Sequence, residues 1–312
     1  MKKNLHFWGK TLKETFIQWN NSSATRDSAS LAYYSIFSIP GLLIIIIWIA
    51  GNFLGEEAIR GQITNQINDL MGEEAALSIQ EMIASALIDK ENILMKTIGV
   101  VSLIYGGTTV FFQLQKSLNK LWNVEAAPKK AILKFLLDRA NSLGMIVVIG
   151  FLLMITMVLS SMISLLNNFI MYQLGYETYL LMTSVNFLFG FILVSLVFAF
   201  MFKVLPDAEI SFKAVWPGAL LTATLFTIGK FLLSLYFAEL KPTSVFGTAG
   251  TVILIMMWIN YSCMLIFFGA EFTKVYSKNK GYKIIPSKHA KWSVEKLYAD
   301  SLKEKQSIAK EM

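Results

Sequence analysis

The stretch Arg26–Gly51, RDSASLAYYSIFSIPGLLIIIIWIAG, joins two unlike halves in one segment. The second half is apolar on every side of a helix, as lipid requires. The first half carries two charges, four serines and two tyrosines before Pro40. A bilayer core of about 30 Å needs about 20 apolar residues in a helix. The stretch therefore predicts a membrane-spanning helix, which Pro40 is expected to kink.

The composition of the whole chain is that of a membrane protein. Of its 312 residues, 55% are hydrophobic and 16% are charged, whereas soluble domains average about 45–50% apolar and about 25% charged residues. The single cysteine, Cys263, lies in an apolar run and is predicted to be a packing residue. The sequence shows no enzyme motif and no metal-ligand constellation. We therefore expect no catalytic activity, no metal and no cofactor.

Six long apolar runs decide the fold class. They are continuous rather than alternating, which indicates helices. We expect an all-α, polytopic membrane bundle of six transmembrane helices. Their approximate ranges are 28–53, 93–114, 140–165, 178–203, 212–238 and 246–273.

Lysine and arginine predict the orientation of these spans. Most of the 28 basic residues lie in the N-terminal arm, the second-to-third and fourth-to-fifth connections, and the C-terminal tail. By the positive-inside rule these segments, and hence both termini, are cytoplasmic. The same rule, with attraction to anionic lipid headgroups, accounts for the net charge of +7. No nucleic-acid partner is predicted.

We divide the chain into a cytoplasmic arm (1–27), a membrane domain (28–275) and a Lys-rich cytoplasmic tail (276–312). The arm is amphipathic at helical spacing and either lies on the membrane surface or packs on the protein's own underside. Its apolar positions are Leu5, Trp8, Leu12, Phe16 and Trp19.

The membrane domain includes an outer cap, 55–92, with two apolar repeats. Ile59, Ile63 and Ile67 recur at helical spacing, and a second set follows Gly72. That second set is Leu77/Ile79, Ile83 and Leu87. These repeats predict two short amphipathic helices, broken near Gly72, over the outer mouth of the bundle.

Ionisable residues at membrane depth are costly, so they are candidates for a functional site. Lys230 lies inside the fifth predicted span. We expect it to face a cavity that would suit an anionic substrate. The alternative is that its long side chain reaches up to the headgroups.

A second polar group is predicted at the cytoplasmic ends of the spans. Arg26 and Asp27 begin the first span, Asp138 and Arg139 begin the third, and Glu271 ends the sixth. They are expected either to lock the helix ends as a network of ion pairs or to form an inner gate.

The polar half of the first span offers a possible cavity wall. Ser28 and Ser35 share one helix face, with Tyr33 beside it, and Pro40 ends this half. A small, hydroxylated face suits either a water-filled cavity or close helix packing.

Four ordered motifs resemble those of the YihY/BrkB membrane protein family. The resemblance covers about residues 20–280 and includes Lys230 followed by Tyr236. The motifs are DSASLAYYSIFSIPGLL (27–43), Asn119 with Trp122, the Leu205-Pro206-Asp207 to Tyr236 segment, and Trp258 and Tyr261 with Gly269-Ala270-Glu271.

The resemblance implies six spans in a bacterial cytoplasmic membrane. The family once carried the label ribonuclease BN, which is generally regarded as mistaken. Suggested roles are transport of lipid-like molecules and resistance to host serum.

These observations favour a transporter or flippase for an amphiphilic, anionic, lipid-like molecule, with membrane lipids as partners. A non-transporting scaffold or envelope-integrity factor is the first alternative. A membrane enzyme, as in the nuclease label, is a remote one. The sequence leaves open whether the chain forms a homo-oligomer.

Overall fold

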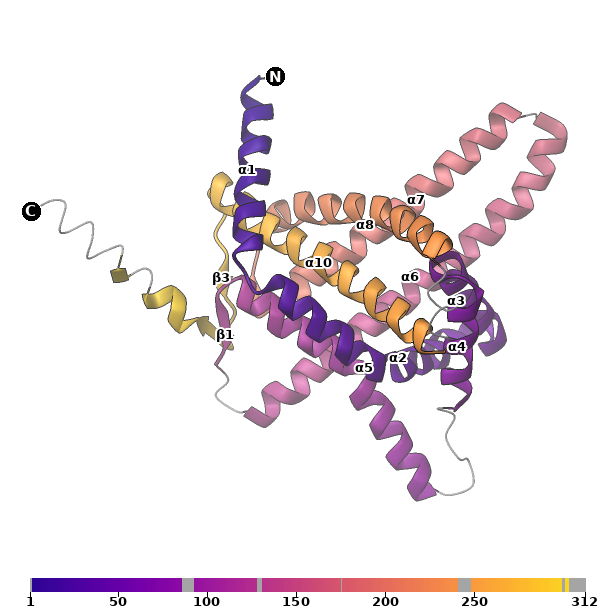
Figure 1. Ribbon diagram of the computed structural model, residues 1–312, viewed down its shortest axis with the longest axis horizontal. Coiled ribbons are helices and arrows are strands. Elements are labelled where there is room, and N and C mark those ends of the chain that lie inside the picture. Colours follow the sequence, from indigo (N-terminus) through magenta and orange to yellow (C-terminus); the bar gives the residue numbers. More distant parts are fainter. Residues whose placement is uncertain are drawn as a thin grey trace, which may run out of the picture.

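The computed structural model describes residues 2–85, 93–127, 131–174, 176–240, 248–298 and 301–302. Within them the chain is a bundle of long helices with two short strand pairs at one end (Figure 1). Six helices build the bundle: α2 (Ala24–Leu54), α5 (Ile93–Leu121), α6 (Ala131–Leu174), α7 (Tyr176–Val204), α8 (Phe212–Leu240) and α10 (Thr248–Lys280).

Five helices of the described part are long and apolar enough to cross a membrane. The segments concerned are Ala24–Leu54, Ile132–Leu152, Phe187–Val204, Phe212–Tyr236 and Gly250–Lys280. The second expected span corresponds to α5, which is not among them. The helix that contains the third expected span, α6, begins at Ala131, nine residues before the expected 140.

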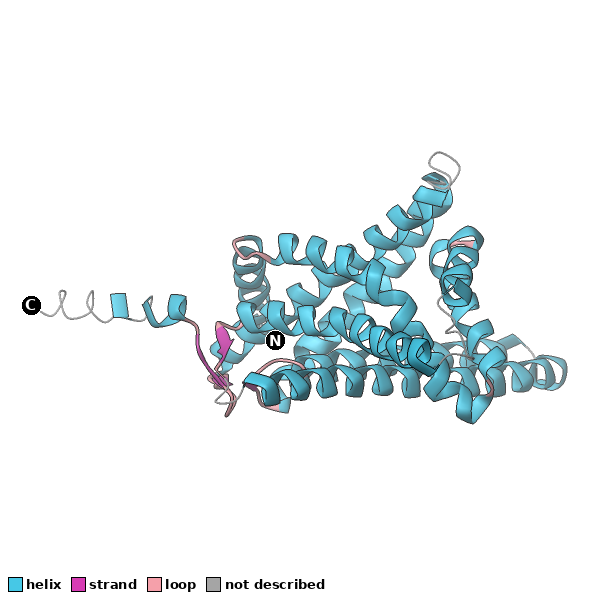
Figure 2. Ribbon diagram, turned by 90° about the horizontal axis from the view of Figure 1, so that it is seen from below, coloured by secondary structure: helices cyan, strands magenta, loops and turns pink. Residues whose placement is uncertain are grey.

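The strands gather where α5 and α7 end, α6 and α8 begin, and α10 ends, and we call this the junction end. Figure 2 shows all the strands at this end, where the C-terminal segment leaves the bundle. Strand β1 (Val124–Ala126) pairs with β4 (Ala290–Trp292), and β2 (Ala208–Glu209) pairs with β3 (Ile285–Pro286).

The fold is mostly helical, as predicted, and these antiparallel pairs are an addition that the sequence did not indicate. After Gly281, which has a φ of 76°, the tail folds back along the two connections between helices. Pairs of only two or three residues are too short to show an alternating pattern in the sequence.

The cap has the two-helix form that the apolar repeats predicted. Helix α3 (Glu56–Met71) and helix α4 (Glu73–Ser85) meet at Gly72, which has a φ of 90°. Ile59, Ile63, Ile79 and Ile83 are buried as expected. Leu77 is instead exposed, and Leu87 lies outside the described residues. The Ser78 hydroxyl lies 3.4 Å from that of Thr251 on α10, at the bundle end opposite the junction.

Helix α1 (Lys2–Asn20) packs beside the last turns of α10. The Trp8 ring stacks on those of Phe272 and Tyr276, with centroids 6.2 and 5.6 Å apart. The Asn279 amide donates hydrogen bonds to Thr11 and Glu14. The structure thus supports packing on the protein itself, while Leu12 and Phe16 remain exposed.

Glycines set the closest helix crossings. A Cβ at Gly107 of α5 would lie 2.9 Å from the backbone nitrogen of Leu42, just after Pro40 in α2. Helices α8 and α10 cross through a reciprocal pair. Gly218 lies against Thr273, and Gly269 lies against Thr222. Each threonine hydroxyl donates to the carbonyl of the glycine in its own helix, which satisfies it at the crossing.

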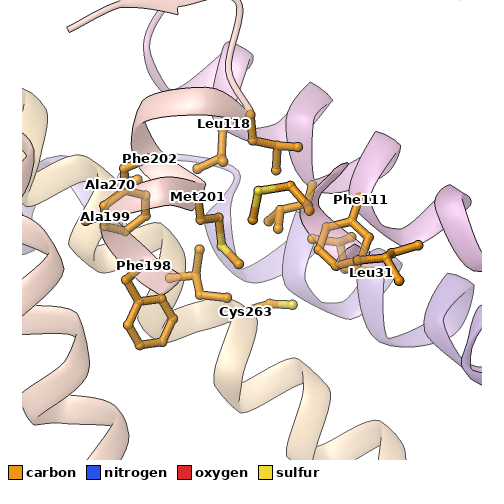
Figure 3. Packing of buried hydrophobic residues seen from close by; sticks show 14 of the residues in the cluster. Leu31, Phe111, Leu118, Phe198, Ala199, Met201, Phe202, Cys263 and Ala270 are labelled. Carbon is orange, nitrogen blue, oxygen red and sulfur yellow. The ribbon is translucent and has the colours of Figure 1, made fainter. Parts of the chain in front are cut away.

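The hydrophobic core joins all six helices of the bundle. Figure 3 shows Leu31, Phe111, Met201 and Cys263 packed together. Burial of Cys263 confirms its predicted packing role. The end of α6 and the start of α7 run side by side beyond the other helices (Figure 1).

Candidate functional site

A buried group of charged and amide side chains lies at the junction end. Helix α5 contributes Gln115 and Asn119, α6 contributes Lys134 and Asp138, and the loop after α7 contributes Asp207. We call these five residues the buried charge cluster.

Lys134 is its centre. Its Nζ lies 2.5 Å from one oxygen of Asp138 and 2.5 Å from one of Asp207. The three side chains are only 10%, 9% and 12% exposed. Asp138 is one turn beyond Lys134 on the same helix, so local geometry brings that pair together. Asp207 arrives from a different element, and Lys134 therefore ties the start of α6 to the loop before α8.

Asn119 and Gln115 complete the coordination of the carboxylates. Asn119 donates from Nδ2 to Asp207 at 2.9 Å and accepts from the Asp207 backbone N–H at 2.7 Å. Gln115 donates to Asp138 at 3.2 Å and lies 3.4 Å from Asp207. Its own Oε1 is buried without a partner among the described residues.

The cluster combines two carboxylates with one ammonium, so its formal charge is −1 when all three are ionised. Partial desolvation makes each member dependent on the others, because an unpaired buried charge is far more costly than a paired one. The arrangement can lock three segments together, and Gln115 Oε1 is free to accept one further hydrogen bond.

A second set of bonds ties α5 to α10. The Trp122 indole donates to the Ala270 carbonyl at 3.0 Å. Lys274 donates to the Leu121 carbonyl at 2.7 Å and pairs with Glu271 at 3.0 Å. The other oxygen of Glu271 is buried without a partner among the described residues.

The five predicted gate residues do not form one network. Asp138 belongs to the buried charge cluster and Glu271 pairs with Lys274. Asp27 accepts from Ser23 at 2.6 Å and faces Lys120 at 3.4 Å. Arg26 is exposed and has no partner within the described part of the chain. These residues lie at similar heights in the bundle, but their side chains point in different directions around the helix axes. They therefore do not meet.

Arg139 points away from Asp138, the residue before it. Its guanidinium lies 2.8 Å from the Thr108 hydroxyl and over the rings of Tyr105, Phe112 and Phe135. An aromatic setting of this kind stabilises a cation without a carboxylate. The expected Asp138–Arg139 network is therefore corrected to two separate sites.

The residues of α2 that were predicted to line a cavity lie on different faces of the helix. Ser35 is 3% exposed, whereas Tyr33 is 56% exposed on another face. Ser28 donates to the Ala24 carbonyl within the helix. The small face of α2 is therefore packed in the core, in agreement with the close-packing alternative, and Pro40 is half-buried.

On α8, Lys230 is half-buried and has no partner among the described residues, while Tyr236 is exposed. A hydroxyl-lined pocket of about 260 Å³ instead opens between α2 and α5 at the junction end. Its polar lining includes Asp27, Ser30, Tyr34, Gln113, Lys116 and Lys120.

Sequence reasoning missed four members of the buried charge cluster. Asn119 and Asp207 stand in motifs that carried the family resemblance, but their roles were not inferred. Lys134 was used only as one of the basic residues that predict the membrane orientation of the spans. The available signal was the polar positions Gln115 and Asn119 on one face of α5, which needed a partner if buried.

Apolar helices of membrane-spanning length, packed around buried charges, define a multi-pass helical membrane protein. The family model described as virulence factor BrkB matches residues 15–293, and the chain belongs to this family.

The relatives are distant in sequence. A UPF0761 membrane protein of Mannheimia succiniciproducens is 21% identical, over 83% of this chain and 87% of its own length. The ribonuclease-like protein YfkH of Bacillus subtilis is 22% identical, over 86% and 96%. A UPF0761 membrane protein of Saccharophagus degradans is 23% identical, and the match spans 60% of its length. No solved structure matches the chain.

Proposed function

We propose that the protein is a transporter or flippase for an amphiphilic, anionic, lipid-like molecule in the bacterial cytoplasmic membrane. In this proposal α5 also crosses the membrane, which brings the number of spans to six, and both termini are cytoplasmic. The junction end then faces the cytoplasm and the α3–α4 cap faces outward.

The observation that carries the proposal is the position of Lys230. It lies within the apolar segment Phe212–Tyr236, between the exposed residues Ile228 and Phe231. Its ammonium has no ion pair or hydrogen bond in the described part of the protein. A cation at this depth is costly without an anion or water. A passing anionic headgroup would supply that partner.

The pocket between α2 and α5 supports the same substrate class. It places Lys116 and Lys120 beside hydroxyl groups, with Asp27 paired to Lys120, and the exposed Tyr34 of α2 is part of its lining. Lysines bind phosphate as compact charges, and exposed tyrosine suits the boundary between headgroups and acyl chains. An anionic amphiphile fits both features.

The test is lipid translocation in proteoliposomes. Fluorescent phosphatidylglycerol and phosphatidylcholine would be followed by dithionite quenching, with Lys230→Ala, Lys230→Arg and wild type compared. Lys213→Ala is the matched control, because it removes an exposed charge at the start of the same helix. A lost bond to a charged group is worth about 1.5–3 kcal/mol, or about ten-fold or more in rate.

We expect wild type and Lys230→Arg to move the anionic lipid, and Lys230→Ala to be slowed. No translocation by wild type above empty liposomes would contradict the proposal for these lipids. Equal slowing by Lys213→Ala would remove the special role of Lys230.

One feature favours a scaffold instead. The segment after β4 exposes Val294, Leu297, Tyr298 and Leu302 at helical spacing. Such a face suits a docked partner or the membrane surface. Deleting 294–312 leaves every strand in place. Loss of a cellular phenotype with unchanged lipid translocation would favour the scaffold.

A further inference from the structure

A second pocket, of about 500 Å³, lies at the seam between the C-terminal tail and the bundle. The end of α10 forms one wall with Lys274, Ser277 and Lys278. The tail forms the other with Tyr282, Trp292 and Lys296. Small-molecule pockets are typically about 300–1,000 Å³, so the seam has the volume of a ligand site.

The charge of the lining favours an anion. Its three lysines are opposed by one carboxylate, Glu295. Lys274 is already shared between Glu271 and the Leu121 carbonyl. Lys278 is exposed, and Lys296 lies over the Trp292 ring. Lys278 from α10 and Lys296 from the tail therefore place two positive charges on opposite walls of the pocket.

Ser277 provides an independent indication of a ligand. It is 1% exposed, and its hydroxyl has no hydrogen-bond partner among the described residues. Buried hydroxyls normally find a partner, and an unmade bond is costly. An oxygen of a bound ligand would satisfy this one.

We propose that this seam binds a phosphate group, held by Lys278, Lys296 and the Ser277 hydroxyl. Phosphate offers several acceptor oxygens to lysine and serine donors. The group belongs either to a soluble phosphorylated compound or to an anionic lipid headgroup. In both cases the ligand contacts the tail and the bundle together. Binding therefore stabilises the strand-paired tail by mass action.

The experiment uses the full chain in detergent micelles without added lipid. Inorganic pyrophosphate and ADP are titrated by calorimetry, and protection of the tail from trypsin is followed in parallel. A second arm uses nanodiscs of phosphatidylglycerol or phosphatidylcholine. Saturable binding of ADP or pyrophosphate identifies a soluble source. Tail protection only in phosphatidylglycerol identifies a headgroup.

Two matched pairs of substitutions locate the site. Lys278→Ala with Lys296→Ala removes both pocket charges, and Lys283→Ala with Lys288→Ala removes two exposed tail charges outside it. We expect the first pair to weaken binding at least about ten-fold, which is about 1.4 kcal/mol, and the second to leave it within about two-fold. Ser277→Ala, which keeps the charge, is expected to weaken it several-fold.

The proposal is overturned if wild type binds neither soluble probe and phosphatidylglycerol gives no protection. It is equally overturned if both pairs weaken binding alike, because general surface charge would then explain it. Neither result depends on lipid translocation, so this inference stands or fails separately from the proposed transport.

Discussion

Asn119 and Asp207, 88 residues apart in the chain, hold one another through two hydrogen bonds. The Asn119 amide donates to the carboxylate, and its carbonyl accepts from the backbone N–H of Asp207. One asparagine thus provides hydrogen-bond partners for both the carboxylate and the backbone N–H of Asp207. Asp207 lies in a loop because Pro206 prevents α7 from continuing as a helix. The pair joins the end of α5 to the connection between α7 and α8.

Replacing Asn119 with alanine is expected to destabilise the protein. It removes both bonds and leaves buried partners unsatisfied, which costs about 1–3 kcal/mol. The measurement is thermal unfolding in detergent, followed by intrinsic fluorescence. Asn141→Ala, at an exposed position of α6, is the control and should be neutral. Equal stability of the two variants would show that the pair contributes nothing.

Lys134→Met is expected to be more damaging than Asn119→Ala. It leaves two buried carboxylates without their cation, and breaking a buried pair costs about 3–5 kcal/mol. Adding Asp138→Asn and Asp207→Asn should restore part of the loss, because the uncompensated charges disappear. Folded yield and unfolding temperature measure both effects. Failure of the neutral triple variant to recover any stability would argue against electrostatics as the cause.

Gly218→Ala is expected to disrupt the crossing of α8 and α10. The added Cβ would overlap the Thr273 hydroxyl and lie 3.0 Å from the Gly269 carbonyl. Overpacking of this kind costs about 1–3 kcal/mol. Combining it with Thr273→Ala should relieve part of the strain. Gly144→Ala on α6, where nothing lies within 4 Å, is the control. A tolerated Gly218→Ala would mean that the helices separate easily.

We expect purified protein to lack ribonuclease activity. Glu271 is 1% exposed and pairs with Lys274 at 3.0 Å, so we assign it a packing role. RNA cleavage would be assayed on wild type and Glu271→Gln after removal of contaminating nucleases. Cleavage by wild type that the substitution abolishes would restore the enzyme alternative.

The local features of the chain could be read from its sequence. Continuous apolar runs predicted the long helices, and the repeats around Gly72 predicted α3 and α4, because helical periodicity is a property of neighbouring residues. Burial of Cys263 followed from its apolar surroundings. The motifs identified the family without revealing what Asn119 or Asp207 contacts.

Only the tertiary structure decided which distant residues meet. The contacts of Lys134 with Asp207, and of Gly218 with Thr273, depend on helix rotation and on loop return. The tail strands pair with segments more than 70 residues away in the chain, so no local sequence pattern predicted these strands. Amino-acid order alone therefore determined an apolar, helical membrane chain, since transfer free energy is a sum over neighbours. Packing geometry decided which charges share a site and which remain exposed.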